Sequence, residues 1–353
     1  MINPVSSDAT LPESAVLELT YNCNHRCKFC SCPWENVEVP PLFYEKHEEL
    51  SVDEWKRALR ILDRSGVGSV TITGGEPLLK AGFAELLRYI REKTSLNHKR
   101  KIIVISNASA MSEAYISLFK ETGVHLSLSL PGLTTYSYHT GTADSSPENV
   151  LHWLRRACEE SIETTVNVTV TRKNCHELYE TLANGLIAGA GTVLLNRFLV
   201  GGRGLTYQNE LSLSPEELRV LLDTAEGVLA SANRVGSVGT EYPLCLIPDG
   251  GTRYKHLRTG SLCAAANGFF VIDPSGYIRT CNHSPKRVGH IFCEPIISDL
   301  VYWNVFAQRA FDLPEMCGGC GFREECDCGC REAASICSGS HAAPDPCFSV
   351  FQL

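Results

Sequence analysis

Apolar and polar positions follow two alternating spacings through the first part of the chain. Short runs rich in Val, Ile, Leu and Thr have the length and composition of β-strands. Stretches with apolar residues three to four positions apart, typical of helices, lie between them. The predicted strands cover 15–20, 69–73, 101–106, 125–130, 163–170 and 192–200. The predicted helices cover 51–66, 81–94, 112–123, 145–160, 175–189 and 213–234.

Helix-capping residues support this division. Ser51 and Ser214 each precede a glutamate by three residues, Glu54 and Glu217, which is the spacing of a capping box. Strands that alternate with helices predict a parallel sheet with right-handed crossovers. Six such units are too few to close an eight-stranded barrel. We therefore expect an α/β fold built as an open, partial (β/α)6 barrel, with its chemistry at the C-terminal strand ends.

The pattern changes after the last predicted helix. A hairpin is expected around Asp273-Pro274-Ser275-Gly276, and a helix within 296–311, before a cysteine-dense end with little periodicity. Such a segment buries too little apolar surface to fold alone, so we expect metal to organise it. The predicted division is an N-terminal tail, the barrel with its following helix, a bridging segment and a small auxiliary domain: 1–14, 15–234, 235–262 and 263–353.

Composition narrows the class of protein. The net charge of −8 and pI near 5.8 argue against a general nucleic-acid binder. The N-terminal residues lack the pattern of a secretory signal, and no apolar run reaches the ~20 residues of a membrane span. We expect a cytoplasmic protein. Because cytosolic thiols stay reduced, the 17 cysteines are expected to bind soft metals rather than form disulfides.

Three closely spaced cysteines follow the first predicted strand. Cys23, Cys27 and Cys30 have the spacing C-x3-C-x2-C on the loop at the strand's C-terminal end. A [4Fe–4S] cluster normally takes four protein thiolates, so three would leave one iron open to a small-molecule ligand. The competing interpretation is a zinc site completed by Cys32 or His25.

A second motif ends the next predicted strand. Residues 73–77 read Thr-Gly-Gly-Glu-Pro, where the glycines allow a ligand close to the backbone and the carboxylate suits an ammonium group. Only one strand–helix unit separates this motif from the three cysteines. With both motifs in place, the chain from residue 15 to about residue 200 resembles the radical S-adenosylmethionine (SAM) superfamily.

That resemblance implies a set of cofactor-binding residues. Cys23, Cys27 and Cys30 would bind a [4Fe–4S] cluster whose open iron chelates the methionine part of SAM. The implied SAM contacts are Gly74, Gly75 and Glu76 at the ammonium, Phe29 at the adenine, and Ser129 on the fourth strand. An arginine expected in the family is missing, because Thr140 and Gly141 stand there. Arg172 and Arg197 are the candidates to replace it, and Cys32 is expected not to be a ligand.

The later cysteines form a second array. Its spacing, from Cys263 through Gly276 and Cys281 to the dense C-terminal end, resembles the seven-cysteine SPASM domain found in radical SAM enzymes that mostly modify peptides and proteins. The resemblance implies two auxiliary [4Fe–4S] clusters: one on Cys317, Cys320, Cys326 and Cys347, the other on Cys263, Cys281 and Cys330. The second cluster lacks a fourth ligand. Either one iron is open, or Cys328, Cys337, Cys293 or His283 completes it.

The favoured function is a radical SAM oxidoreductase that takes a hydrogen atom from a ribosomally made precursor peptide and forms a C–C or C–heteroatom crosslink. Its expected partners are the peptide and an electron donor such as flavodoxin or ferredoxin, with no nucleic acid or membrane. Either a separate leader-binding protein presents the peptide, or the barrel and tail bind it directly. A sulfatase-maturing enzyme is an alternative, but that family has an aspartate base where this chain has Asn282. Two further alternatives are a small-molecule radical SAM enzyme and a non-catalytic iron–sulfur protein for electron transfer or redox sensing.

Overall fold

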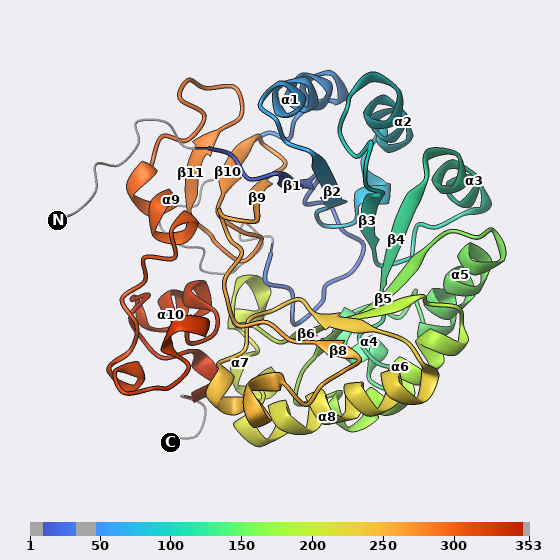
Figure 1. Cartoon of the computed structure of the whole chain (residues 1–353). Helices are drawn as coiled ribbons and strands as arrows, with labels where there is room; N and C mark the ends of the chain where they lie inside the picture. The colour runs from blue at the N-terminus through green and yellow to red at the C-terminus, as the bar shows by residue number, and fades with distance from the viewer. Residues whose placement is uncertain (1–9, 33–46, 349–353) are drawn as a thin grey trace.

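The computed structural model describes residues 10–32 and 47–348. It is built on one eleven-stranded sheet with the strand order β11-β10-β9-β1-β2-β3-β4-β5-β6-β7-β8 (Figure 1). The first six strands are β1 Ser14–Glu18, β2 Ser69–Thr73, β3 Ile102–Ser106, β4 Val124–Ser129, β5 Thr164–Val170 and β6 Thr192–Arg197. They pair in sequence order and in parallel, and the sheet does not close. The predicted partial barrel is therefore confirmed.

Helices cover the outside of this curved sheet, as Figure 1 shows. The covering helices are α1 Val52–Arg64, α2 Phe83–Lys93, α3 Glu113–Thr122, α5 Pro147–Glu159, α6 Leu178–Ile187 and α8 Pro215–Ala232. Both capping boxes form, at Ser51 and Ser214, and they satisfy backbone N–H groups that α1 and α8 would otherwise leave unpaired. Buried side chains such as Trp55 and Ile72, which are fully inaccessible to solvent, fill the layer between helices and sheet.

The bridging segment and the tail extend the barrel sheet at both edges. β7 Gly236–Val238 and β8 Leu257–Arg258 continue it in parallel beyond β6, which the sequence pattern did not predict because both strands are very short. At the other edge, β9 Phe269–Ile272 pairs in parallel with β1. The expected hairpin then follows as β9, β10 Tyr277–Arg279 and β11 Arg287–His290. The proposed domain boundaries remain a prediction, since the sheet runs across them.

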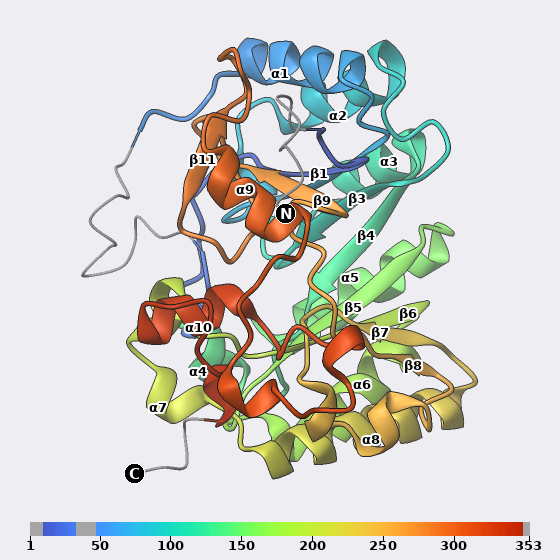
Figure 2. The same cartoon turned by 60° about the vertical axis from the view of Figure 1, so that its left-hand side comes forward.

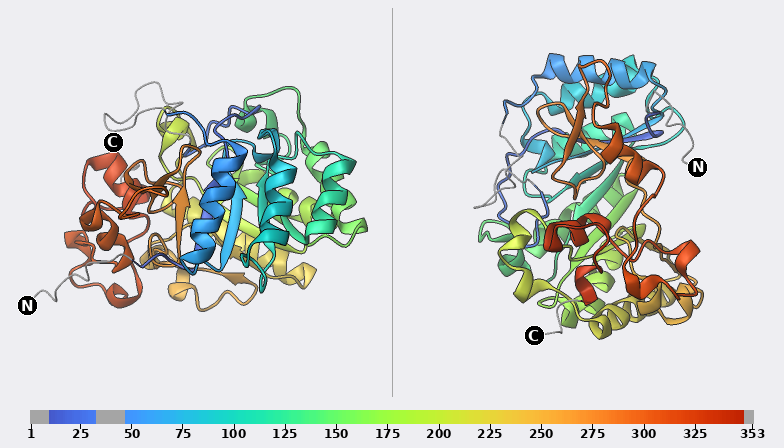
Figure 3. Two further views of the ribbon diagram at one scale, coloured as in Figure 1. Left: turned by 90° about the horizontal axis from the view of Figure 1, so that it is seen from above. Right: turned by 90° about the vertical axis from the view of Figure 1, so that its left-hand side faces the viewer.

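Short helices complete the chain: α4 Tyr136–Thr140, α7 Gln208–Leu211, α9 Leu300–Ala307 and α10 Arg331–Ser338. Figures 2 and 3 show the tail gathered at one side of the barrel, with α9 beside the strands of the hairpin. Within the described residues, no helix combines the length and apolar character needed to cross a bilayer.

Two buried ion pairs join the tail to the barrel. Glu18 on β1 pairs with Arg279 on β10, and Arg197 on β6 pairs with Asp345 at an Nη2–Oδ2 distance of 2.5 Å. All four side chains are at most 3% exposed. Removing one member of such a pair leaves an uncompensated buried charge. The tail is thus fixed to the barrel wall at two separate strands.

Candidate functional site

The loop that carries the first three cysteines lies against the end of β2. The backbone N–H groups of Gly75 and Glu76 donate to the carbonyls of Thr20 and Asn22, at 2.7 and 2.9 Å. A Cβ added at Gly74 would lie 2.4 Å from the Thr20 carbonyl, and one at Gly75 would lie 2.4 Å from the Asn22 carbonyl. The two glycines are therefore needed for the close approach of the two loops. The sequence alone predicts only that these glycines let a ligand approach the backbone closely.

This junction forms one wall of a cavity of about 160 Å³. Cys23, Cys27 and Cys30 line it together with Gly74 and Gly75. Two further predicted SAM contacts, Phe29 and Ser129, line it as well. Residues that sequence reasoning missed include Asn107, Tyr136 and Arg203, and His25, considered from the sequence only as a zinc ligand, lines the cavity as well. The C-terminal ends of β1 to β4 thus bring most of the predicted site residues to one hollow.

Burial controls the protonation of the three thiols. Burial raises the pKa of Cys23, raises that of Cys30 to about 11, and raises that of Cys27 well above its ordinary value. The charge of the Arg203 guanidinium acts in the opposite direction and lowers the pKa of all three thiols. The same guanidinium donates a hydrogen bond to the Cys27 carbonyl at 3.2 Å. Without a bound cation these thiols stay protonated, and a metal centre would stabilise them as thiolates.

The arrangement fits a cluster better than a single ion. A zinc ion holds thiolates at about 2.3 Å, so its ligands must converge on one point. Among the described residues, no three His, Cys, Asp or Glu side chains converge in this way. The three thiols instead surround the wider cavity, which leaves room for a multi-iron group with one position free of protein ligands.

Glu76 and Arg172 lie apart from the cavity lining. The Glu76 carboxylate is fully buried and accepts hydrogen bonds from the Leu78 and Asn107 backbone N–H groups and the Ser106 hydroxyl, at 2.7 to 3.1 Å. Burial raises its pKa to about 7. Nε of Arg172 lies 3.5 Å from a carboxylate oxygen of Glu217, and its Nη1 lies 3.5 Å from the Asn209 carbonyl oxygen. Their roles toward SAM remain predictions.

A second, larger cavity of about 430 Å³ continues from the first into the barrel. The two share Phe29, Cys30, Thr73, Gly74 and Ile105. The far wall of this larger cavity, which we call the chamber, carries three cysteines of the tail: Cys263, Cys281 and Cys330. Asn167 on β5 and Asn196 on β6 face it from the barrel side. Cys30 and Cys263, which are 233 residues apart in sequence, therefore line the same chamber.

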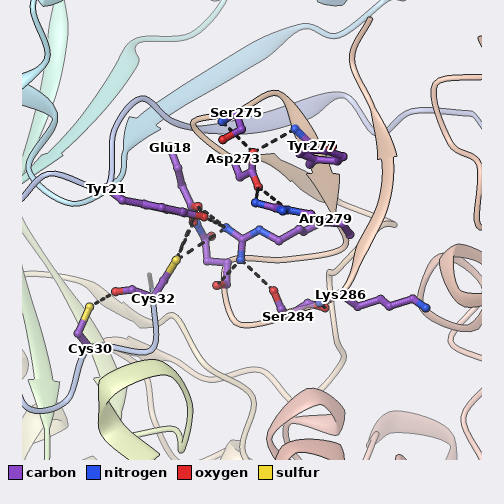
Figure 4. Close-up of polar contacts among 12 residues, drawn as sticks. Glu18, Tyr21, Cys30, Cys32, Asp273, Ser275, Tyr277, Arg279, Ser284 and Lys286 are labelled. Atoms are coloured by element: carbon purple, nitrogen blue, oxygen red, sulfur yellow. Dashed lines mark hydrogen bonds and ion pairs between the residues drawn. The ribbon is translucent and has the colours of Figure 1, made fainter. Parts of the chain in front are cut away.

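Cys32, the fourth cysteine of the loop after β1, lines the chamber and not the cavity that Cys23, Cys27 and Cys30 line. Figure 4 shows Cys32 beside the Glu18–Arg279 pair. Its sulfur lies 3.7 and 3.8 Å from the Glu18 carboxylate oxygens and 3.8 Å from Nη2 of Arg279. The Tyr21 hydroxyl and the Asn282 amide also donate to Glu18, at 2.9 and 3.0 Å. Cys32 thus packs against a buried polar network, and its assignment as a cysteine that is not a ligand remains a prediction.

A third cavity of about 160 Å³ lies among the C-terminal cysteines. Three of the four cysteines predicted to hold one auxiliary cluster, Cys317, Cys320 and Cys326, line it. Cys245, which had no assigned role, and Cys328, a candidate ligand of the other auxiliary cluster, line it as well. Cys347 is buried but does not line this cavity. Burial raises the pKa of the Cys347 thiol well above its ordinary value, and the charges of Asp345 and of a deprotonated Cys328 raise it further, so its side chain lies near both. The assignment of Cys347 as a ligand therefore remains a prediction.

Comparison with known proteins decides the nature of the barrel. Residues 17–183 match the family model of the Radical SAM superfamily. Residues 17–183 form a radical SAM domain. The chain is also 28% identical to the PqqA peptide cyclase of Rhodopseudomonas palustris, over 97% of this chain and 88% of that protein. It is 25% identical to the sporulation killing factor maturation protein SkfB of Bacillus subtilis, over 81% and 64%.

Solved structures extend the similarity from the radical SAM domain to the tail. Streptococcus suis SuiB bound to its precursor peptide SuiA matches 98% of this chain and 76% of its own, with a TM-score of 0.71 at 18% identity. The structure of anSMEcpe with bound AdoMet and Cp18Cys peptide matches 96% and 94%, with a TM-score of 0.70 at 16% identity. At these identities the likeness concerns the fold.

Arg203 is the residue of the first cavity that sequence reasoning could have noticed. It lies in the stretch Gly201-Gly202-Arg203-Gly204, directly after β6. A Cβ on Gly202 would lie 2.5 Å from the backbone of Ser31, so the glycine lets this segment touch the cysteine loop. A glycine-flanked arginine at a C-terminal strand end was the available signal.

Proposed function

We propose that this protein is a radical SAM enzyme with a SPASM-type tail that removes hydrogen from a ribosomally made peptide and forms a crosslink within it. The observation that carries the proposal is the chamber of about 430 Å³, which has the first cysteine group at one end and Cys263, Cys281 and Cys330 at the other. A peptide side chain held there lies between a site for radical generation and a site for electron removal. Similarity to the PqqA peptide cyclase and to SuiB supports a peptide substrate.

Six residues that line the first cavity have a proposed task. Cys23, Cys27 and Cys30 would hold a [4Fe–4S] cluster, which supplies the electron that cleaves SAM to a 5′-deoxyadenosyl radical. Phe29 offers an aromatic face to the adenine, and Ser129 a hydroxyl to the cofactor. Arg203, next to the three thiols, balances part of their negative charge once they are deprotonated.

The chamber contributes shielding and orientation. The barrel and tail walls of the chamber limit the access of solvent to a reactive radical, and Asn167 and Asn196 offer amide groups that can fix a peptide backbone or side chain. The auxiliary clusters are proposed on the cysteine sets predicted from the sequence. Of these, the set with Cys263, Cys281 and Cys330 is proposed as the one nearest the substrate, because it lines the same chamber.

The sulfatase-maturing alternative has weaker support. Its aspartate base is replaced by Asn282, and the Asn282 side chain acts as a donor, bonding Glu18 at 3.0 Å. A small-molecule substrate would leave much of so large a chamber unfilled. A non-catalytic iron–sulfur protein has no need of a large chamber between two groups of cysteines.

The proposal includes partners. A precursor peptide is the substrate, a low-potential donor such as flavodoxin or ferredoxin supplies electrons, and a separate protein presents the peptide leader. The expected compartment is the cytoplasm, where thiols and clusters stay reduced.

The test uses anaerobically reconstituted full-length protein. With reductant and SAM alone we expect slow formation of 5′-deoxyadenosine. With a short peptide encoded beside the gene, we expect a product lighter by two hydrogen atoms and fragmentation that is blocked across the crosslink. A protein that forms no 5′-deoxyadenosine under any condition is not this enzyme. Cleavage that is never coupled to any peptide would contradict the proposed substrate class.

A further inference from the structure

The cysteine set that faces the chamber is one ligand short of a complete cluster. Cys263, Cys281 and Cys330 supply three thiols to this wall. A [4Fe–4S] cluster normally takes four protein ligands, so either the fourth iron is open or another side chain binds it. Four candidates follow from the sequence: Cys328, Cys337, Cys293 and His283.

The three candidate cysteines are excluded by position. Cys328 lines the third cavity, where its thiol interacts with that of Cys317. Cys293 is exposed and lies in the turn after β11. Cys337 is exposed near the end of α10. None of the three lines the chamber.

His283 lines the chamber and meets the description of a metal ligand. It is 7% exposed, and its Nε2 is buried without a hydrogen-bond partner. The imidazole hydrogen-bonds the backbone of Val200, and because Nε2 has no partner, this bond uses Nδ1. An Nδ1–H donor to a carbonyl leaves the Nε2 lone pair free, and metal-binding histidines almost always have such a second contact.

The backbone around His283 fixes the ring further. A Cβ on Gly201 would lie 2.6 Å from Cε1 of the imidazole, so only glycine lets the ring take this place. His283 also follows Cys281 by two residues, and the Cys281 thiol faces the backbone N–H groups of His283 and Ser284. The same short turn therefore presents one thiol and one imidazole to the chamber wall.

We propose that Nε2 of His283 is the fourth protein ligand of the auxiliary cluster held by Cys263, Cys281 and Cys330. The assignment rests on the cluster being present, as in the proposed function, and adds the ligand that the cysteine pattern does not supply. Imidazole is a good ligand for iron and replaces thiolate in some iron–sulfur centres, where it raises the reduction potential. A raised potential suits a cluster that takes an electron from a substrate-derived radical.

Two carboxylates are the competing ligands in this wall. Glu332 is occupied, because Tyr302 donates to it at 2.7 Å and it is also 3.8 Å from Nε2 of His341. Glu241 lines the chamber and, when charged, raises the pKa of all three thiols, which shows that it lies near them. Glu241 is therefore the variant against which His283 is compared.

The decisive experiment uses the intact holoenzyme. Protein labelled with ¹⁵N only at histidine is reconstituted with iron and sulfide, reduced, and examined by pulsed EPR. We expect a directly coordinated nitrogen coupling in the wild type. We expect it to be lost in His283→Cys, which supplies a thiolate instead, retains the full iron content and shifts one midpoint potential downward. Glu241→Gln and His25→Ala should keep the coupling.

Several results would overturn the assignment. One is a wild-type spectrum without histidine nitrogen coupling, and another is a coupling that survives in His283→Cys. A third is a change of the cluster signal in Glu241→Gln but not in His283→Cys, which would make Glu241 the ligand. Because these measurements need no peptide, they are separate from the proposed function. A holoenzyme with the coupling but without peptide product would contradict only the function, and product without the coupling would contradict only the ligand.

Discussion

The two cysteine-rich regions differ in what positions their thiols. In the loop after β1, backbone hydrogen bonds from the barrel do this work: Arg26 and Lys28 donate to the carbonyls of Thr140 and His139, at 2.8 and 2.9 Å. In the tail, buried carboxylates do it. Asp327 accepts from the Cys263 N–H, and Asp345 accepts from the Cys330 and Cys347 N–H groups, at 2.7 to 3.0 Å.

This difference indicates which region depends on bound metal for its fold. The first loop lies on the partial barrel, whose apolar core would remain if the cluster were absent. The tail has short helices, and buried thiols and charges make up much of its interior. We therefore expect the first site to be preorganised and the tail to fold around its clusters.

The largest expected effect follows from removing the first cluster. Cys23→Ala, Cys27→Ala and Cys30→Ala combined should abolish SAM cleavage completely, because no ligands remain for the electron-donating iron. With three [4Fe–4S] clusters, about twelve irons per chain are expected, and this variant should lose about a third of them while remaining folded. Iron, sulfide and 5′-deoxyadenosine are measured after anaerobic reconstitution.

The control for this variant is Cys158→Ala, which removes an exposed cysteine on α5. It should keep both the iron content and SAM cleavage. A preparation of the wild type with one zinc and no labile sulfide would refute the cluster assignment for this site.

Removing the chamber cluster should separate cleavage from product formation. In Cys263→Ala with Cys281→Ala, the peptide product should disappear while uncoupled SAM cleavage continues at the intact first cluster. The reason is that the radical left on the peptide has to lose an electron before a crosslink is complete. Product and 5′-deoxyadenosine are quantified in the same reaction.

Cys293→Ala, an exposed cysteine of the same tail, is the matched control and should retain full coupling. If the double variant stayed soluble, kept the first cluster and still made full product, the electron-acceptor role of this cluster would be excluded.

The same contrast explains what the sequence could predict. The six strands and their helices follow from periodicity and caps, because each element buries an apolar face of its own. The three thiols of the first site follow from local spacing. In contrast, β7 and β8 are too short to leave a pattern. The contacts of Asp345 with Arg197 and of Glu18 with Arg279 join residues 148 and 261 positions apart. No local pattern encodes such pairs.

A smaller effect is expected from loosening the tail without touching a cysteine. Asp345→Asn removes the charge opposite the buried Arg197 and should lower stability by roughly 3–5 kcal/mol, the cost of breaking a buried pair. Under increasing denaturant, the auxiliary clusters should be lost before the first cluster. Iron release and visible absorbance follow the two stages.

Glu121→Gln provides the comparison on the barrel surface. Its partner is Arg88, and both side chains are about half exposed, at 51% and 46%. Exposed pairs contribute at most about 1 kcal/mol, so this variant should unfold like the wild type. Simultaneous loss of all clusters in Asp345→Asn would show that barrel and tail unfold as one unit.

A more local effect is expected at Glu76. Glu76→Gln should weaken SAM binding by roughly 1.5–3 kcal/mol, the contribution of a hydrogen bond to a charged group. The amide keeps only one acceptor oxygen for the N–H groups of Leu78 and Asn107, so the turn around the cavity should also loosen. Calorimetric titration of SAM measures the change, with the exposed Glu113→Gln as control. Unchanged affinity would leave Glu76 a purely structural role.

The smallest expected effect is the pH dependence of that binding. Burial raises the pKa of Glu76 from its ordinary 4.5 to about 7, so its contribution to folding is present at low pH and lost as pH rises through about 7. A nearby ammonium favours the charged carboxylate, so SAM affinity should rise through the same window, by at most about tenfold per pH unit. Of the neighbours that interact with Glu76, Tyr115 has a pKa raised above 10, and Cys23 as a ligand does not titrate. Glu76→Gln should therefore flatten the profile between pH 5 and pH 8. Parallel profiles for the two proteins would mean that the carboxylate does not face the SAM ammonium, and that the glycines alone make the contact at this end of β2.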